Sequence, residues 1–297
     1  MPAPAAVNSA PWAFHPHPVA WAGVAAASLA YAACVRRPAY AAGRLQVRSF
    51  AGAMAVLVVA LSWPVADLAA HWSLTALVLQ RLALTLAVPP LLLAALPRAL
   101  VARATRPAVI DAALMSAGRP PVAVGVVTVV FVATLTTGAV DAQSSSALAR
   151  ALLDVAVLGA GAVLWLPVTA PVPGTTRPGA LGRAGYLIVQ SILPSFLAVV
   201  WILARHPLYP AFDHPGSLAG LSPLADQEVA GFLAKLGTIA VLWTVAFVGV
   251  TRSERTADGD SEEPPLTWVD VERHLERAER RQRRGTPGAA DGGPGPP

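Results

Sequence analysis

Charged side chains are scarce in this sequence. They make up 13% of its 297 residues, whereas soluble domains contain roughly 25%. Cysteine is almost missing as well, since Cys34 stands alone, and this excludes an internal disulfide and a multi-thiolate metal site. The three methionines, Met1, Met54 and Met115, are too few for a methionine-rich metal site.

Sequence signatures of catalysis are missing too. We find no nucleophile with a plausible general base and no glycine-rich phosphate loop beside a strand, so we do not expect an enzyme. The sequence pI of 10.1 comes from arginines between apolar stretches and in the C-terminal tail. It therefore does not indicate binding to nucleic acid.

Long apolar stretches are what this sequence has in abundance. A transmembrane helix needs roughly 20 apolar residues to cross a hydrocarbon layer of about 30 Å, and a helix satisfies its own backbone hydrogen bonds in lipid. We therefore predict an all-α integral membrane protein, a bundle of seven transmembrane helices in a lipid bilayer. The predicted helices are 18–35, 50–70, 73–97, 121–140, 148–170, 184–204 and 226–250.

Arginines fall in alternate connections, and this pattern predicts the orientation. The connections after the first and third predicted helices carry four arginines each, whereas those after the second and fourth carry no lysine or arginine. Basic residues mark the cytoplasmic side of a membrane protein. We therefore expect the N-terminus outside and the C-terminus in the cytoplasm.

The predicted organisation has three parts. Residues 1–17 form a short extracytoplasmic tail rich in proline, and residues 18–251 form the seven-helix membrane domain. Residues 252–297 form a cytoplasmic tail. Apolar residues at helical spacing predict a short amphipathic helix at about 267–284 within this tail, and the Gly/Pro-rich end that follows is typical of disorder.

Several segments together resemble a known family. They are PHPVAWAGVAAASLAYAACVRR (16–37), RSFAGAMAVLVVALSWPVADLAA (48–70), LVLQRLALTLAVPPLLLAALP (77–97), LGAGAVLWLPVTAPVP (158–173), HPLYPAF (206–212) and LSPLADQEVAGFLAKL (221–236). In this order they resemble the CtaG-type cytochrome c oxidase assembly proteins, multi-pass bacterial proteins linked to copper delivery. The resemblance implies a bacterial plasma membrane, cytochrome oxidase subunits as partners, and copper.

Some residues match the motifs of that family and others depart from them. The matching residues are Gln80, Pro89, Pro90, Gly161, Trp165, Asp226, Gln227 and Gly231. The family carries histidine pairs, which can hold one metal from a single helix face, in its third and fifth helices, and Met-Trp in its last. The residues at those positions here are Leu77, Arg81, Ala149, Leu153, Ala234 and Lys235.

The six histidines all lie outside the apolar spans. His15, His17, His206 and His214 fall on the predicted outer side and could gather there around copper or zinc, although loop histidines are usually only polar surface residues. We therefore predict no firm metal site and no cofactor beyond the copper that the resemblance implies.

Three charged residues lie deep inside the predicted spans, away from their ends. By the helical rise, Arg81 and Asp154 are roughly 12 Å deep and Lys235 about 15 Å. Ionisable groups inside membrane spans face the protein interior and usually pair. We predict that the three residues form one buried polar cluster where the family holds its metal. The alternative is that Arg81 snorkels and Lys235 reaches an outer cavity separately.

The function that we predict is a membrane-embedded assembly factor that assists cytochrome c oxidase biogenesis. Copper delivery is implied by the resemblance, although the expected ligands are missing. Two other classes stay open. One is a transporter of small solutes, protons or metal ions, in which Asp154 would serve a proton relay, although no internal repeat is visible. The other is a metal-free membrane scaffold.

Overall fold

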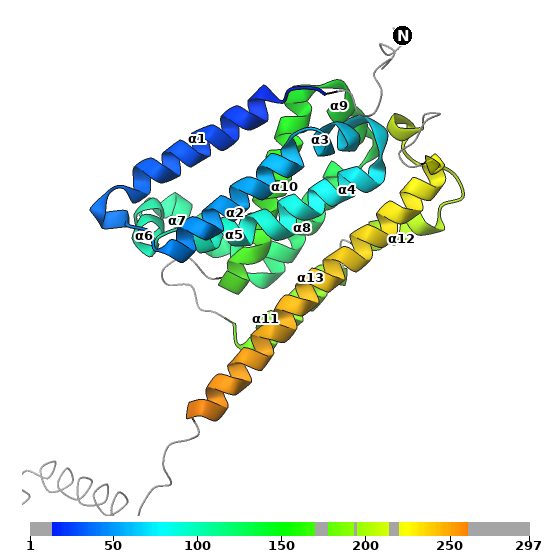
Figure 1. Ribbon diagram of the computed structural model, residues 1–297. Coiled ribbons are helices and arrows are strands. Elements are labelled where there is room, and N and C mark those ends of the chain that lie inside the picture. Colours follow the sequence, from blue (N-terminus) through cyan, green and yellow to red (C-terminus); the bar gives the residue numbers. More distant parts are fainter. Residues whose placement is uncertain (1–13, 170–177, 193–194, 214–219, 261–297) are drawn as a thin grey trace, which may run out of the picture. The chain divides into compact units, whose positions relative to one another are not determined.

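The regular secondary structure of the described part of the protein is all helical. The computed structural model describes residues 14–169, 178–192, 195–213 and 220–260, and no strand occurs among them. The all-α fold is therefore confirmed for this part, whose arrangement Figure 1 shows. In chain order the elements are α1 (Pro18–Val35), the 3-10 turn η1 (Pro38–Tyr40), α2 (Arg44–Leu61), α3 (Val65–Asp67), the π-helical turn η2 (Leu68–Trp72), α4 (Leu74–Leu82), the π-helical turn η3 (Ala83–Ala87), α5 (Val88–Ala95), α6 (Arg98–Ala104), α7 (Ala108–Ala117), α8 (Pro120–Thr134), α9 (Thr137–Ser145), α10 (Ala147–Thr169), α11 (Ala180–Ile192), α12 (Ser195–Leu203), the 3-10 turn η4 (Pro210–Phe212) and α13 (Pro223–Asp260).

Six helical stretches in the described residues are long and apolar enough to cross a membrane, as in a multi-pass membrane protein. They correspond to six of the seven predicted helices. The second differs most from its prediction, because α2 ends at Leu61 rather than at residue 70. Pro64 has no N–H with which to continue the helical hydrogen bonding. The six stretches are Pro18–Val35, Arg44–Leu61, Leu74–Ala95, Ala147–Thr169, Ala180–Leu203 and Pro223–Ser253.

The seventh candidate is a bent pair. Helix α8 has 15 residues, fewer than the roughly 20 that a span needs. Helix α7 precedes α8 and is bent from it by 85°. The helix predicted at 121–140 is therefore shorter than expected, because α8 ends at Thr134 and a new helix, α9, begins at Thr137.

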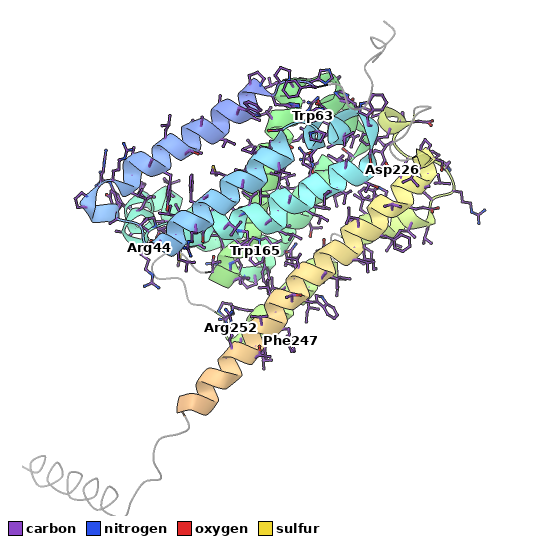
Figure 2. All side chains as sticks on the ribbon, viewed as in Figure 1. Arg44, Trp63, Trp165, Asp226, Phe247 and Arg252 are labelled. Atoms are coloured by element: carbon purple, nitrogen blue, oxygen red, sulfur yellow. The ribbon has the colours of Figure 1, made fainter. Side chains whose placement is uncertain are left out.

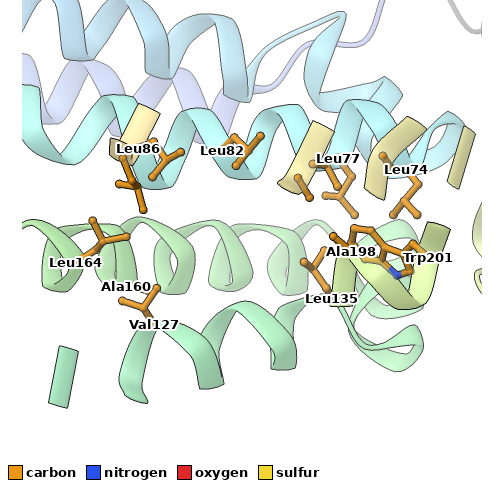
Figure 3. Close-up of a cluster of buried hydrophobic side chains, with 14 of the residues drawn as sticks. Leu74, Leu77, Leu82, Leu86, Val127, Leu135, Ala160, Leu164, Ala198 and Trp201 are labelled. Carbon is orange, nitrogen blue, oxygen red and sulfur yellow. The ribbon is translucent and has the colours of Figure 1, made fainter. Parts of the chain in front are cut away.

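Two clusters of buried side chains hold the helices together. Figure 3 shows the larger one, in which leucines from α4 and η3 meet residues of α8, α10 and α12. A smaller cluster packs α2 and α10 against the α4–α5 stretch. The larger cluster includes Leu74, Leu77, Leu82, Leu86, Val127, Leu135, Leu164, Ala198 and Trp201, and the smaller one Ala53, Met54, Leu57, Leu84, Val88 and Val157.

The predicted tails fall largely outside the description. Residues 1–13 and 261–297 are not described, so the amphipathic helix predicted at 267–284 and the disordered end lie outside the described residues. The fold and the site described below belong to one compact unit, Met1–Val250.

Candidate functional site

The Pro89–Pro90 pair leaves one backbone acceptor without a helical donor. The carbonyl of Thr85 would accept from the N–H four residues on in an α-helix, or five residues on in a π-helix. Those residues are the two prolines, which have no N–H. Trp165 on α10, labelled in Figure 2, supplies the missing donor, because its buried indole Nε1 lies 3.1 Å from Thr85 O.

Gly161 allows this hydrogen bond to form. A Cβ atom at Gly161 would lie 2.8 Å from Thr85 Cα and 2.7 Å from Pro89 Cγ, a separation that Cβ atoms essentially never show. Helix α10 therefore packs directly against the backbone of η3. The Gly-x-x-x-Trp motif and the Pro-Pro motif are the two sides of one contact.

The Gln80 side chain satisfies the backbone acceptor that a second proline, Pro64, leaves without a donor. Pro64 cannot donate to the carbonyl of Ala60, four residues before it. The buried Gln80 side chain on α4 donates to Ala60 O from Nε2 at 2.9 Å. The end of α2 is thereby fastened to the last turn of α4.

Asp226 connects the start of α13 to the start of α4 (Figure 2). Its carboxylate accepts a hydrogen bond from Ser73 Oγ at 2.8 Å and another from the Leu74 backbone N–H at 2.7 Å. Thr75 Oγ1 donates to the Asp226 backbone carbonyl at 2.9 Å. The first N–H groups of a helix have no intrahelical acceptor and carry partial positive charge, so a carboxylate from another helix stabilises this end of α4.

Gln227 and Gly231 fasten α13 to α12. Gln227 accepts from the Leu208 N–H at 2.7 Å and donates to Trp201 O at 3.3 Å. A Cβ atom at Gly231 would lie 2.8 Å from Ala198 O, so α12 and α13 approach closely there.

Tyr209, in the family-like HPLYPAF segment, adds a buried hydrogen-bonded pair beside α12. Its hydroxyl donates to Leu135 O at 2.6 Å and accepts from Trp201 Nε1 at 3.0 Å. Burial raises the pKa of Tyr209 to about 12, against the lowering effect of the Trp201 hydrogen bond. The hydroxyl therefore remains a donor at neutral pH.

Arg81 lies inside the bundle with two partners. The residue is fully buried, with 0% of its surface exposed. Its Nη1 lies 3.4 Å from Asp154 Oδ1 on α10, and its Nη2 donates to Gln143 Oε1 on α9 at 2.8 Å. A buried cation needs such compensation, because an uncompensated charge in a membrane span is costly.

The contacts extend from Gln143 to a second arginine. Arg150 donates to Gln143 O from Nε and Nη2, each at 3.3 Å, and its Nη2 lies 3.3 Å from His71 Nε2. We call Arg81, Gln143, Arg150, Asp154 and His71 the Arg81 network. It joins η2, α4, α9 and α10.

Asp67 is a second buried carboxylate, in α3. Its Oδ1 lies 3.3 Å from His17 Nε2 and its Oδ2 lies 3.5 Å from His15 Nδ1. The two predicted histidines thus lie beside a buried carboxylate.

The structure brings Arg81 and Asp154 together, but it places Lys235 elsewhere. No carboxylate of the described residues lies within ion-pair distance of Lys235. The face of α13 that packs on α4 includes Gly237, whose Cβ would lie 3.0 Å from a Leu82 methyl group, and the buried Ala234. Lys235 is rotated by about 100° from Ala234 around the helix. Its half-buried side chain therefore points away from the face of α13 that packs on α4.

The predicted outer histidines do not form a metal site among the described residues. No group of three or more His, Cys, Asp or Glu residues there is placed to hold a metal ion. His206 is exposed, and His214 lies outside the described residues. Leu77, where the family resemblance places a histidine, is a fully buried core residue.

Sequence reasoning missed Gln143, Arg150 and Asp67. Gln143 is a neutral residue in a stretch taken for a loop, and Arg150 lies at the edge of an apolar span, where arginine is ordinary. The positions of the orphaned carbonyls could have been found from the prolines alone. Their donors could not, because Gln80 and Trp165 lie 20 and 80 residues away in the chain.

Comparison with known proteins gives one family. Residues 29–255 match the cytochrome c oxidase caa3 assembly factor (Caa3_CtaG) family, and all eight motif residues named in the sequence analysis lie within that range. No curated protein matches the chain. No solved structure matches it either.

Proposed function

Because this chain belongs to the cytochrome c oxidase caa3 assembly factor family, we propose that it assists assembly of a cytochrome c oxidase in a bacterial plasma membrane. The observation that carries the proposal is the family match over residues 29–255. The hydrogen bonds at Gln80, Trp165 and Asp226 support it, because they give the family-like motif residues a shared physical task in holding the bundle together.

The partners that we propose are subunits of the oxidase. A bundle with six or seven apolar stretches lies in the same bilayer as an oxidase subunit and can hold it during assembly. The Arg81 network offers polar groups for such a contact, because Arg150 and His71 are half-buried rather than enclosed. We propose that the protein acts through this binding and not through a reaction of its own.

Copper held between the helices is not part of the proposal. Arg81 stands where the family resemblance places a histidine, and it is fully buried. Its guanidinium carries a positive charge. A copper ion placed beside a cation in a low-dielectric interior is repelled. The residues present at these positions therefore do not fit an intramembrane copper site, and we propose a metal-free role for the bundle.

The test is a strain that lacks this protein. We expect its membranes to contain less assembled oxidase, measured as oxidase activity and as the amount of each oxidase subunit. Complementation with the wild-type chain or with Glu228→Gln, a half-buried carboxylate in the same helix as Asp226, restores both. Normal oxidase levels in the deletion strain would contradict the proposal.

The same strain separates the proposal from the transporter alternative. A transporter predicts unchanged oxidase together with an altered flux of protons, metal ions or a small solute. Copper in the oxidase gives a further distinction. If the subunits are present at normal levels but lack copper, the protein acts in metal delivery and the metal-free role is wrong.

A further inference from the structure

Eight exposed arginines gather at one end of the bundle. They come from the connection between α1 and α2, the first turns of α2, and the segment from α6 to the start of α8. We call this set the arginine platform. Its members are Arg36, Arg37, Arg44, Arg48, Arg98, Arg103, Arg106 and Arg119.

Tertiary contacts bring the two halves of the platform together. Turn η1, which follows Arg37, packs on α6. The Gln46 side chain on α2 donates to Leu96 O at 3.3 Å, and Tyr31 on α1 donates to Ala95 O at 3.1 Å. Loops that are about 60 residues apart in the sequence therefore form one surface. Figure 1 shows the end of α1 beside α6 and α7.

Within the described residues, no ion pair neutralises the positive charge of this surface. Asp111 is the only carboxylate between Asp67 and Asp141, and the ion pairs of the described residues all lie elsewhere. Guanidinium groups present several donors in a planar fork that matches the oxygens of a phosphate. The platform thus has the charge and the donor geometry for phosphate groups.

Apolar side chains among the arginines point to a lipid rather than a soluble anion. Helix α7 has no buried residue, and it exposes Val109, Ile110 and Met115 by 81%, 45% and 38%. It is bent by 85° from α8, as expected of a helix that leaves a span and follows the membrane surface. Cationic and apolar side chains together are typical of helices that lie in the interface of a bilayer.

We propose that the arginine platform is a binding site for the phosphate groups of anionic phospholipids. The residues lie where apolar spans end, which is the depth of the headgroups. Basic clusters at this position bind anionic lipids of the cytoplasmic leaflet. The site would hold the α6–α7 segment on the membrane surface and select anionic lipids around the bundle.

The test measures which lipids stay bound to the purified full-length protein. The protein is placed in bilayers of equal parts phosphatidylglycerol and phosphatidylcholine with the same acyl chains, and bound lipids are counted by native mass spectrometry. We expect an excess of bound phosphatidylglycerol over phosphatidylcholine. In a variant with Arg36, Arg37, Arg103 and Arg106 changed to Gln, the excess falls, by roughly fivefold for each arginine that contacts a phosphate.

A matched variant controls for net charge. Changing Arg280, Arg281, Arg283 and Arg284 to Gln removes the same charge from the C-terminal tail and leaves the excess unchanged. Equal losses in the two variants would overturn the proposal. So would inorganic phosphate that displaces the lipid at millimolar concentration, because the site would then be one for a free anion.

Two further controls separate a loss of lipid binding from a loss of folding. The thermal midpoint of each variant in phosphatidylcholine alone shows whether it is folded, and the pair Arg36→Gln with Arg37→Gln replaces the four-site variant if that one unfolds. The readout does not involve the oxidase. Failure of the lipid proposal therefore leaves the proposed assembly function untouched. Failure of the assembly proposal likewise leaves the lipid proposal untouched.

Discussion

The Trp165 indole N–H lies 3.1 Å from the carbonyl oxygen of Thr85, the acceptor that Pro89 and Pro90 leave without a backbone donor. Gln80 has the same relationship to Ala60, whose carbonyl Pro64 leaves without a donor. Prolines in membrane helices are tolerated where a neighbouring helix satisfies the freed backbone groups. In this protein the side chains of Trp165 and Gln80 satisfy the freed carbonyls.

Trp165→Phe should destabilise the bundle by about 1–3 kcal/mol, because the buried Thr85 carbonyl loses its donor. The measurement is thermal unfolding of the purified protein in detergent. Pro89→Ala returns an N–H four residues after Thr85, so the double variant should lose less than the sum of the single changes. Additive losses would show that the two residues do not act on one carbonyl.

Trp243→Phe is the matched control for that series. Its indole donates to Ser191 Oγ at 3.0 Å, but the residue is 48% exposed. Trp243→Phe should therefore destabilise the bundle far less than Trp165→Phe. A loss as large as that of Trp165→Phe would mean that any tryptophan substitution destabilises the bundle, whatever hydrogen bond it removes.

Gly161→Ala should lower stability by about 1–3 kcal/mol, the usual cost of overpacking. The added methyl group meets Thr85 backbone atoms at 2.8 and 2.9 Å, and backbone cannot move aside as a flexible side chain can. Gly159→Ala, two residues away in the same helix, meets nothing within 4 Å and should not destabilise the protein. Equal thermal midpoints for the two variants would be evidence against close packing of α10 on η3.

Asp154→Leu should destabilise the protein by about 3–5 kcal/mol, because it leaves the buried Arg81 without its carboxylate. The double change Arg81→Leu with Asp154→Leu should recover much of that loss. The Gln143 Oε1 atom loses the donor that Arg81 supplied, so recovery should be incomplete. The idea fails if the two single changes add independently in thermal unfolding.

Purified protein should carry less than one copper per chain, measured by elemental analysis after treatment with a chelator. Arg81 and Leu77 stand where the family resemblance places imidazoles, and neither side chain can bind the ion. Stoichiometric copper that survives the chelator would contradict this. The residues to change first would then be His15, His17, His206 and His214.

A reporter enzyme fused after Thr251 should be active only as a cytoplasmic reporter. The expectation rests on the arginine-rich connections, because basic residues are typical of the cytoplasmic side of a membrane protein. The same reporter fused before Pro18 should be inactive, because the N-terminus is expected outside the cytoplasm. Cytoplasmic activity from both fusions would mean an even number of spans, and the bent pair α7–α8 would then not cross the membrane.

The sequence by itself was sufficient for the membrane class, most of the helices and the family. These depend on local properties, namely the length of apolar runs and the order of short motifs, and no tertiary contact is needed to read them. The bent pair α7–α8 escaped prediction, because the predicted helix at 121–140 begins after the bend, and its apolar run does not reveal that α8 ends at Thr134. Charge inside the spans drew attention to Arg81 and Asp154, which lie 3.4 Å apart in the structure.

Only the tertiary structure decided what those residues touch. Lys235 has a charge and a depth similar to those of Arg81, yet a rotation of one residue around α13 removes it from the face that packs on α4. Gln143 and Trp165 carry no formal charge, and their importance arises from the acceptors that meet them across the bundle. Apolar periodicity sets which segments enter the membrane, whereas helix rotation and close approach at Gly161 and Gly231 set which polar groups pair, and these are properties of the packed bundle.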